Sequence, residues 1–374
     1  MTNNRNSRSF PILILLFVLG SGFAGAQASG DLSRPHDWWY TLEQGKLRFR
    51  QGDYSSALIA FDDARRQRLA MYERMERDLI HLLSISEVRR IGDSLEWIER
   101  YIHDRRHDAV AAALAELYYR IPKESLDNSA AAALKALGTL KDYPEAEYWI
   151  GEVYLLEGEL PLAMTQFKKA LDLRELHENP GLVTDLLYKI AAICNIRQEY
   201  NEMESVLISI LSADKMFSGN DYARTSMTRI LENNGINRFL TMYRYNNTEL
   251  MEAHRLLGYY YFSRGRHSKA QEHFMFAFLI QNTVVIEEIT RSRPDFSFTA
   301  LEGLIAEINR RPHLTDYAEK NEYFKIAYYL GASLYGNGKT STARELWHFL
   351  AAQNNADEWQ TRSITQLRNP RIRE

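Results

Sequence analysis

One spaced pattern of small and aromatic residues occurs four times in this chain. A glycine is followed after six residues by a second glycine, after four more by an alanine, and after three more by an aromatic residue. After two more residues, a small or apolar residue closes the pattern. The copies are Gly45/Gly52/Ala57/Phe61/Ala64, Gly151/Gly158/Ala163/Phe167/Ala170, Gly258/Gly265/Ala270/Phe274/Ala277 and Gly331/Gly338/Ala343/Trp347/Leu350. Repetition at a fixed spacing indicates a protein built from stacked, equivalent units.

Each position of the pattern has a mechanical meaning. The first glycine is predicted to lie inside a helix, where a neighbouring helix comes too close for a side chain. The second glycine is predicted to end that helix at a position that needs a positive φ. The alanine then lies in the next helix at the tightest crossing, and the aromatic residue one turn later fills the space beside it. The pattern therefore predicts paired antiparallel helices and an all-α fold.

These copies closely resemble the tetratricopeptide repeat, a 34-residue helix–turn–helix unit. The clearest copy reads EAEYWIGEVYLLEGELPLAMTQFKKAL, and the first reads WYTLEQGKLRFRQGDYSSALIAFDDAR. The family's early tryptophan is absent, its terminal proline is missing from all four copies, and the last copy has a tryptophan and a leucine where phenylalanine and alanine are usual. The residues at the place of the early tryptophan are Thr41, Glu147, His254 and Ala327. The resemblance implies a right-handed superhelical solenoid.

The intervals between copies predict how many units the chain contains. The first glycines are separated by 106, 107 and 73 residues, close to three, three and two periods. We therefore expect about nine antiparallel helix pairs across 29–357, followed by a C-terminal capping helix and basic tail over 358–374. Clear repeats are predicted at 38–71, 144–177, 251–284 and 324–357, with a degenerate copy at 184–217. Further degenerate pairs are expected over 72–105, 108–141, 221–249 and 286–321, with a helix stop at Asn233–Gly235.

The N-terminus predicts export. Arg5 and Arg8 precede a ten-residue apolar run, Phe10–Leu19, which is too short to span a bilayer. Small residues with Ala-x-Ala spacing follow, so residues 1–28 are interpreted as a cleaved secretory signal peptide. An uncleaved membrane anchor is the alternative. We predict a periplasmic or secreted bacterial protein with no membrane span after cleavage.

Cysteine content and charge argue against three further properties: lipidation, an intramolecular disulfide and a nucleic-acid partner. The single cysteine, Cys194, lies far from the apolar run, which excludes lipidation there, and it cannot form an intramolecular disulfide. It is expected to be a small core residue. Removal of the signal peptide leaves 44 basic and 49 acidic residues, a net charge of −5. This mildly acidic balance argues against a nucleic-acid partner. The arginines of the C-terminal tail are expected to be solvated rather than to form an anionic docking patch.

Motifs that could carry catalysis or bind a cofactor are weak. The GNGKTS stretch at Gly336–Ser341 lacks the first glycine of a phosphate-binding loop, where Ser333 stands, and it follows a predicted helix rather than a strand. His103 and His107 are spaced i, i+4, but no carboxylate completes a recognised ligand pattern. We therefore predict no catalytic residue, no cofactor, no metal site and no enzymatic activity.

The family resemblance also indicates a binding face. In tetratricopeptide domains, repeat positions 2, 5, 9, 12 and 13 line a concave groove that binds peptides or partner helices. Carried over to this chain, those positions give an aromatic set. The predicted partner-binding residues are Phe49, Tyr148, Tyr188, Tyr259, Phe262, Tyr328 and Tyr335. Aromatic side chains gathered in a concavity are typical binding anchors, although packing between helices is the alternative for each. The Lys/Asn/Arg set with which chaperone-binding members hold a terminal carboxylate is absent.

The function predicted from these features is a non-enzymatic periplasmic scaffold or adaptor. It would bind protein partners through the aromatic groove, in envelope or cell-surface assembly. Envelope proteins of this architecture serve outer-membrane assembly, transporter accessory complexes, cell division and, in spirochaetes, periplasmic flagellar structures. Two alternatives from other classes are a soluble small-ligand carrier with the groove closed into a pocket, and an envelope hydrolase. A closed apolar cavity would favour the first, and converging buried carboxylates would favour the second.

Overall fold

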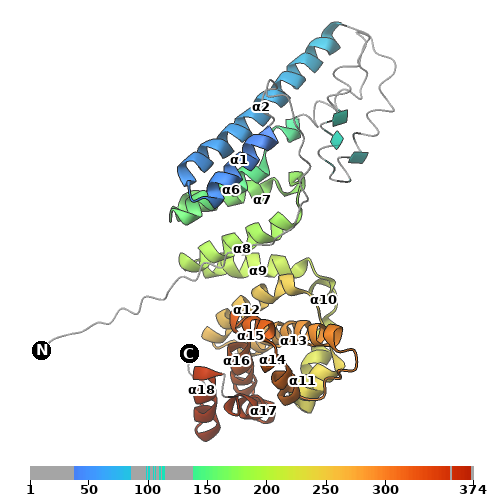
Figure 1. Cartoon of the computed structure of the whole chain (residues 1–374), viewed down its shortest axis with the longest axis vertical. Helices are drawn as coiled ribbons and strands as arrows, with labels where there is room; N and C mark the ends of the chain where they lie inside the picture. Colours follow the sequence, from blue (N-terminus) through green and yellow to red (C-terminus); the bar gives the residue numbers. More distant parts are fainter. Residues whose placement is uncertain are drawn as a thin grey trace, which may run out of the picture.

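The computed structural model describes residues 38–85, 138–353 and 356–371, together with single positions between 98 and 113 (Figure 1). Every regular element in these residues is a helix, so the all-α prediction is confirmed for the described part of the chain. The predicted signal peptide at 1–28 lies outside the described residues. So do His103 and His107, and most of the two degenerate pairs expected over 72–105 and 108–141.

Ten of the described helices form five pairs. The first three pairs are α1 (Trp38–Arg50) with α2 (Tyr54–Ile85), α6 (Pro144–Leu156) with α7 (Leu160–Asp172), and α8 (Gly181–Ile196) with α9 (Tyr200–Ser212). The last two are α12 (Thr248–Ser263) with α13 (His267–Ser292), and α16 (Tyr323–Gly336) with α17 (Thr340–Ala351). Helix α18 (Asp357–Arg368) follows, in the segment expected to hold the capping helix.

The remaining described helices lie between pairs. They are η1 (Arg174–Leu176, a 3-10 turn), α10 (Lys215–Ser218), α11 (Asp221–Met242), α14 (Leu301–Asn309) and α15 (Pro312–Lys320). Glycine 235 breaks α11 with φ 81° and ψ 174°, so the helix stop predicted at Asn233–Gly235 is confirmed. Asn220, rather than the acidic residue after it, caps this helix by accepting a hydrogen bond from the amide of Ala223 at 3.2 Å.

Successive pairs pack through one recurring contact. The second helix of each pair lies against the first helix of the next, in the order α2 with α6, α7 with α8, α9 with α12, α13 with α16, and α17 with α18. Figure 1 shows the pairs following one another along the longest axis, from α1 and α2 at one end to α16, α17 and α18 at the other. The five predicted repeat segments are therefore direct neighbours in space.

This packing differs from the expectation of about nine units in one continuous row. Contacts pass directly from α2 to α6, from α9 to α12 and from α13 to α16, although long segments separate these helices in sequence. Helix α11 instead lies against α13 and α17, while α14 and α15 lie against α13 and α16. The intervals happen to be near multiples of the period, but these intervening segments lack the glycine–aromatic pattern. Within the described residues, α11, α14 and α15 are therefore additions beside the row of pairs.

The first glycine of each unit accommodates the aromatic residue of the same unit. A Cβ atom placed on Gly151 would lie 2.6 Å from the ring of Phe167, well inside van der Waals contact. The corresponding distances are 2.5 Å for Gly45 to Phe61, 2.7 Å for Gly258 to Phe274 and 2.9 Å for Gly331 to Trp347. The close approach predicted for these glycines is confirmed, and the aromatic ring of the paired helix is what comes close.

The other positions of the pattern also behave as predicted. The second glycines have left-handed φ values, namely Gly52 at 80°, Gly158 at 80°, Gly265 at 67° and Gly338 at 75°. The alanines are completely buried, namely Ala57, Ala163, Ala270 and Ala343. In the degenerate copy Gln198 takes the turn position with φ 62°, and Leu207 replaces the aromatic ring opposite Ala191. A smaller leucine leaves room for the methyl group of that alanine.

No helix in the described ranges combines the length and the apolar character needed to cross a bilayer.

Candidate functional site

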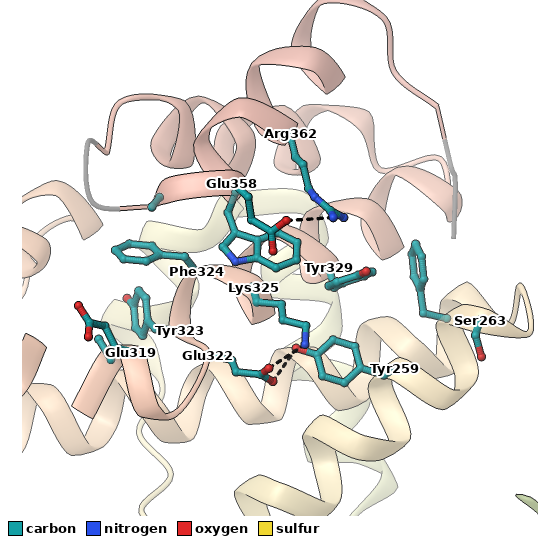
Figure 2. A pocket seen from close by; sticks show the side chains of 14 residues that line it. Tyr259, Ser263, Glu319, Glu322, Tyr323, Phe324, Lys325, Tyr329, Glu358 and Arg362 are labelled. Carbon is teal, nitrogen blue, oxygen red and sulfur yellow. Dashed lines mark hydrogen bonds and ion pairs between the residues drawn. The ribbon is translucent and has the colours of Figure 1, made fainter. Parts of the chain in front are cut away.

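A cavity of about 780 Å³ lies against the first helices of successive units, α12, α16 and α18, with α15 at one side (Figure 2). Its lining residues are Tyr259, Phe262, Ser263, Ala318, Glu319, Glu322, Tyr323, Phe324, Lys325, Tyr329, Ala356, Glu358, Trp359 and Arg362. Four of these side chains are exposed, namely Ser263, Glu319, Glu358 and Arg362, so the cavity opens to solvent. Its volume is in the range of known ligand sites.

The floor of the cavity is a network of aromatic rings centred on Tyr329. Its ring centroid lies 5.2 Å from that of Tyr259 and 5.0 Å from that of Phe262, both at 81° between planes. The ring centroid of Trp359 on α18 lies 5.9 Å from that of Tyr329. Phe274 stacks on Tyr329, with ring centroids 5.8 Å apart. Edge-to-face and stacked pairs are the preferred aromatic geometries. Three helices therefore present one preformed aromatic surface.

Two cations lie over this surface, and each is paired with a carboxylate. Lys325 Nζ lies 4.6 Å from the ring centroid of Tyr259 and 2.7 Å from Glu322 Oε1. The guanidinium of Arg362 lies 4.7 Å from the ring centroid of Trp359, and its Nη2 lies 3.1 Å from Glu358 Oε2. Each arrangement combines a cation–π contact with an ion pair. The rim is thus charged, while the floor is apolar.

Glu322 holds an unusual backbone conformation at this rim. It has φ 54° and ψ 39°, and among the described residues only one other non-glycine residue, Gln198, has a positive φ. Such a conformation costs about 1–3 kcal/mol and persists only where surrounding contacts impose it. Here the carboxylate pairs with Arg255 and Lys325 and accepts a hydrogen bond from the Tyr259 hydroxyl at 3.3 Å. These contacts tie α12 to the start of α16.

The same contacts decide the charge states of the rim. Burial alone would raise the pKa of the Glu322 carboxyl, but the charges of Arg255 and Lys325 and hydrogen bonds from both lower it overall. Burial, together with the negative charge of Glu322, raises the pKa of the Tyr259 hydroxyl. Burial also raises the pKa of Tyr329. Glu322 is therefore an anion at neutral pH, and both phenols are neutral hydrogen-bond donors.

Two of the seven aromatic residues predicted to bind a partner, Tyr259 and Phe262, line this cavity. Phe49 is half-buried and lies edge-on to Trp149 of the next pair, with ring centroids 5.3 Å apart. Tyr335 packs on the repeat tryptophan, Trp347, at 5.6 Å. The structure therefore divides the predicted set between the cavity and the contacts between helices.

Tyr148 and Tyr188 join successive pairs through their hydroxyl groups. The Tyr148 hydroxyl donates a hydrogen bond to the carboxylate of Asp185 on α8. The Tyr188 hydroxyl donates to the carbonyl oxygen of Glu249 and accepts from the amide of Ala253 at 3.2 Å. The side chain of Tyr148 is only 6% exposed. The exposure expected for Tyr148 is thus corrected, because its polar end is occupied by the neighbouring unit.

Tyr328 is also buried, at 7% exposure, and this corrects the same expectation at the C-terminal end. Its hydroxyl accepts a hydrogen bond from Gln366 Nε2 at 3.0 Å, and its ring lies 5.4 Å from that of Trp359. It supports the cavity from behind, while its neighbour Tyr329 faces the cavity. The family's groove positions predicted Tyr328 as the cavity residue, whereas the next residue, Tyr329, lines the cavity.

Sequence reasoning also missed Trp359 and Arg362, although a signal for them exists. They lie one 34-residue period after Lys325 and Tyr328, so they occupy positions 2 and 5 of one further unit. Helix α18 accordingly packs against α17 as the first helix of a unit does. Extending the repeat by one period past 357 would have placed both residues on the groove side.

Carboxylates with raised pKa values are engaged in structural contacts. Burial raises the pKa of Glu152, whose Oε2 lies 3.0 Å from Lys189 Nζ. Burial also raises the pKa of Glu345, which accepts a hydrogen bond from the Ile236 amide at 3.1 Å beside the break in α11. Neither residue lines the cavity. The cavity carboxylates Glu322 and Glu358 are each paired with a cation, which suits binding rather than general acid catalysis.

One group of potential metal ligands occurs in the described residues. The ligand atoms of Cys194, Glu199 and Glu202 lie within 4.8 Å of one another. Burial, together with these two carboxylates, raises the pKa of the Cys194 thiol to about 11, so the thiol is protonated at neutral pH. Glu202 lies 2.6 Å from Lys168, and Glu199 lies 2.8 Å from Arg197. A protonated thiol and two paired carboxylates are a poor ligand set.

Comparisons with known proteins reveal similarity over the full length of this chain. No family model matches it. A protein of uncharacterized function from Treponema pallidum (strain Nichols) is 22% identical over 371 residues, covering 98% of this chain and 99% of that protein. A second uncharacterized protein, from Borreliella burgdorferi, is 19% identical over 214 residues, covering 52% of this chain and 66% of that protein. The similarity to the Treponema pallidum protein thus extends over nearly the whole of both chains.

Proposed function

We propose that this chain is a tetratricopeptide-like solenoid that acts as a non-enzymatic scaffold or adaptor. Its concave face, made by the first helix of each unit, binds a protein partner. The repeated glycine–aromatic contact and the second-to-first helix packing support the solenoid assignment. The export signal expected at 1–28 is the basis for proposing a location in the bacterial periplasm or outside the cell.

The observation that carries this proposal is the aromatic cavity itself. It spans α12, α16 and α18, which are first helices of consecutive units, so it lies on the face that the repeat devotes to binding. Tyrosine and tryptophan combine a large apolar area with a polar end, which is why they dominate binding hot spots. Their edge-to-face contacts fix the rings before a partner arrives, which lowers the entropic cost of binding.

The charged rim favours a protein partner over a small apolar ligand. Glu319, Glu358 and Arg362 are exposed at the cavity, so its mouth is polar and open. A carrier of an apolar molecule would instead enclose it in a closed apolar pocket. The hydrolase alternative lacks a supporting pair of buried carboxylates, because Glu322 and Glu358 are each paired with a cation and Glu319 is exposed.

The cell envelope is the place to seek the partner. Both relatives come from spirochaetes. Among the envelope processes served by this architecture, the periplasmic flagellar apparatus is therefore the first to examine. We propose it as the starting point for partner identification.

Affinity capture from envelope extracts tests the proposed function. The full chain is immobilised, captured proteins are identified, and one is purified to measure its dissociation constant. Tyr329→Ala and Trp359→Ala should each weaken binding by at least ~2 kcal/mol, about 30-fold. Tyr222→Ala is the matched control, because Tyr222 is 84% exposed on α11, outside the cavity. Folded Tyr329 and Trp359 variants that bind like the parent would refute the proposed face.

A further inference from the structure

We infer that the occupant of this cavity is an extended peptide segment of the partner that carries a lysine or arginine next to an aliphatic or proline residue. The inference rests on the proposed function and specifies the chemistry of its partner. It follows from the size of the cavity, the charge balance of its rim and the order of residues along it.

The cavity does not enclose the volume of two helical turns, so a bound helix would have to lie partly outside it. Two turns of α-helix are about 11 Å long and 10–12 Å wide with side chains, a cylinder of roughly 850–1,200 Å³. The cavity measures about 780 Å³. An extended segment is narrower and covers more length per residue, about 3.3 Å. Extended and polyproline-type segments are also the form in which peptides dock between aromatic side chains.

The rim carries one carboxylate that its own cations do not neutralise. Three carboxylates of the described residues line the cavity, and two of them are paired: Glu322 with Arg255 and Lys325, and Glu358 with Arg362. The third, Glu319, is exposed near the end of α15 and has no ion-pair partner within the described residues. A cationic side chain of a bound peptide would complete this pairing. An acidic side chain at the same place would instead be repelled by Glu319.

The order of residues along the cavity separates a charged end from an apolar middle. Figure 2 shows Glu319 at one end and Ser263 at the other, with Lys325 and Tyr329 between them. The faces of Tyr259 and Trp359 already carry cations, which leaves the Tyr329 region for an uncharged side chain. A basic residue at the Glu319 end therefore places an adjacent aliphatic or proline residue on the aromatic floor.

A peptide array tests this inference with defined probes. The array carries immobilised nonapeptides built on a glycine–serine background, each with one Leu-Pro pair. One further position holds arginine, glutamate or serine, and its distance from the Leu-Pro pair is varied through all spacings. Arginine peptides should bind the full chain about threefold to tenfold better than glutamate peptides of the same spacing, as expected for one partly exposed ion pair. The Trp359→Ala variant should bind neither the arginine peptides nor the glutamate peptides.

Charge reversal on α15 identifies the residue responsible. Glu319→Lys should invert the preference, so that glutamate peptides bind better than arginine peptides. Asp316→Lys is the matched control, because Asp316 is an exposed acid on the same helix that does not line the cavity. That variant should keep the arginine preference. An acidic preference in the parent, or an arginine preference that survives Glu319→Lys, would overturn the inference.

The outcome is separable from the proposed function. If captured partners still depend on Tyr329 and Trp359 while the array shows no basic preference, the partner chemistry is wrong and the scaffold function stands. If neither measurement depends on these two residues, both proposals fail.

Discussion

Two buried histidines should make this protein lose stability in mild acid. Nδ1 of His254 on α12 lies 3.1 Å from Nδ1 of His273 on α13. His254 is completely buried and His273 is 7% exposed. Such a contact needs one ring to donate a proton and the other to accept it, so the accepting ring is neutral. Phe217 of α10 packs against both, with ring centroids 4.8 and 6.1 Å away.

The surroundings of this pair resist protonation. Burial is the main cause, and it lowers the pKa of His254 well below 6.5 with help from His273 and Arg224. Burial, together with the positive charges of Lys269 and Arg224, lowers the pKa of His273 to about 3. The folded state therefore binds fewer protons than the unfolded chain between about pH 6.5 and 3. The free energy of unfolding therefore keeps its full value above pH 6.5 and falls progressively as the pH is lowered below it.

The size of the effect follows from the linkage relation. Between pH 7 and 5.5, protonation of one histidine in the unfolded chain lowers the free energy of unfolding by about 1.3 kcal/mol, because each pH unit below the unfolded pKa is worth about 1.4 kcal/mol. The pair together contributes about 2.5 kcal/mol. Typical domains have only about 5–15 kcal/mol in total. This window lies above the titration range of unfolded carboxylates, so few other groups interfere.

Urea unfolding at pH 7 and 5.5, followed by circular dichroism, measures this loss. The double variant His254→Phe/His273→Phe should lose about 2.5 kcal/mol less than the parent across the same pH interval. His313→Gln is the control, because His313 is exposed on α15, and it should lose as much as the parent. Equal losses in the parent and in the double variant would refute the assignment of both histidines as neutral buried groups.

Three further outcomes are expected. In urea unfolding, Ala163→Leu should lower the free energy of unfolding by about 1–3 kcal/mol, because it overpacks a fully buried helix crossing. The control Lys168→Leu loses one partly exposed ion pair and should change the free energy of unfolding by at most about 1 kcal/mol. Gln198→Gly should stabilise by about 0.5–1 kcal/mol in the same assay, because glycine removes the strain of a left-handed backbone and loses part of the gain to entropy. N-terminal sequencing of the exported protein should begin near Gln27 or Ser29, and a mature chain that retains the apolar run would contradict cleavage.

Local geometry was predictable because the repeat encodes it within a few residues. The glycine seven residues before the turn glycine was predicted to lie where the paired helix comes too close for a side chain. The close approach of the Phe167 ring to Gly151 matches this prediction. The two helices of each unit followed for the same reason, whereas α2 and α13 run past the boundaries predicted at 71 and 284. Even the degenerate copy was recognisable, since Ala191 and Leu207 stand at the positions of the first glycine and the aromatic residue and both are buried.

Longer-range features could not be predicted from the pattern. The number of stacked pairs depends on whether an intervening segment carries the contact residues, and interval lengths alone do not reveal this. Ion pairs between distant segments, such as Arg255 with Glu322, depend on which additions lie beside which helix. The left-handed backbone of Glu322 likewise has no signature in the sequence. Most of the charged rim of the cavity was therefore invisible from the sequence alone.

The cavity forms where the chain departs from its repeat. In a regular row of units the concave face would stay an open groove, because every unit contributes the same two helices. Here α15 belongs to an addition, and its Ala318 and Glu319 close one side of the groove. At the other side α18 is a first helix for which the described chain shows no second helix, and it supplies Trp359 and Arg362. Sequences commonly break their local rules at functional sites. Both departures meet at this one cavity, which is why we place partner binding there rather than along the regular N-terminal units.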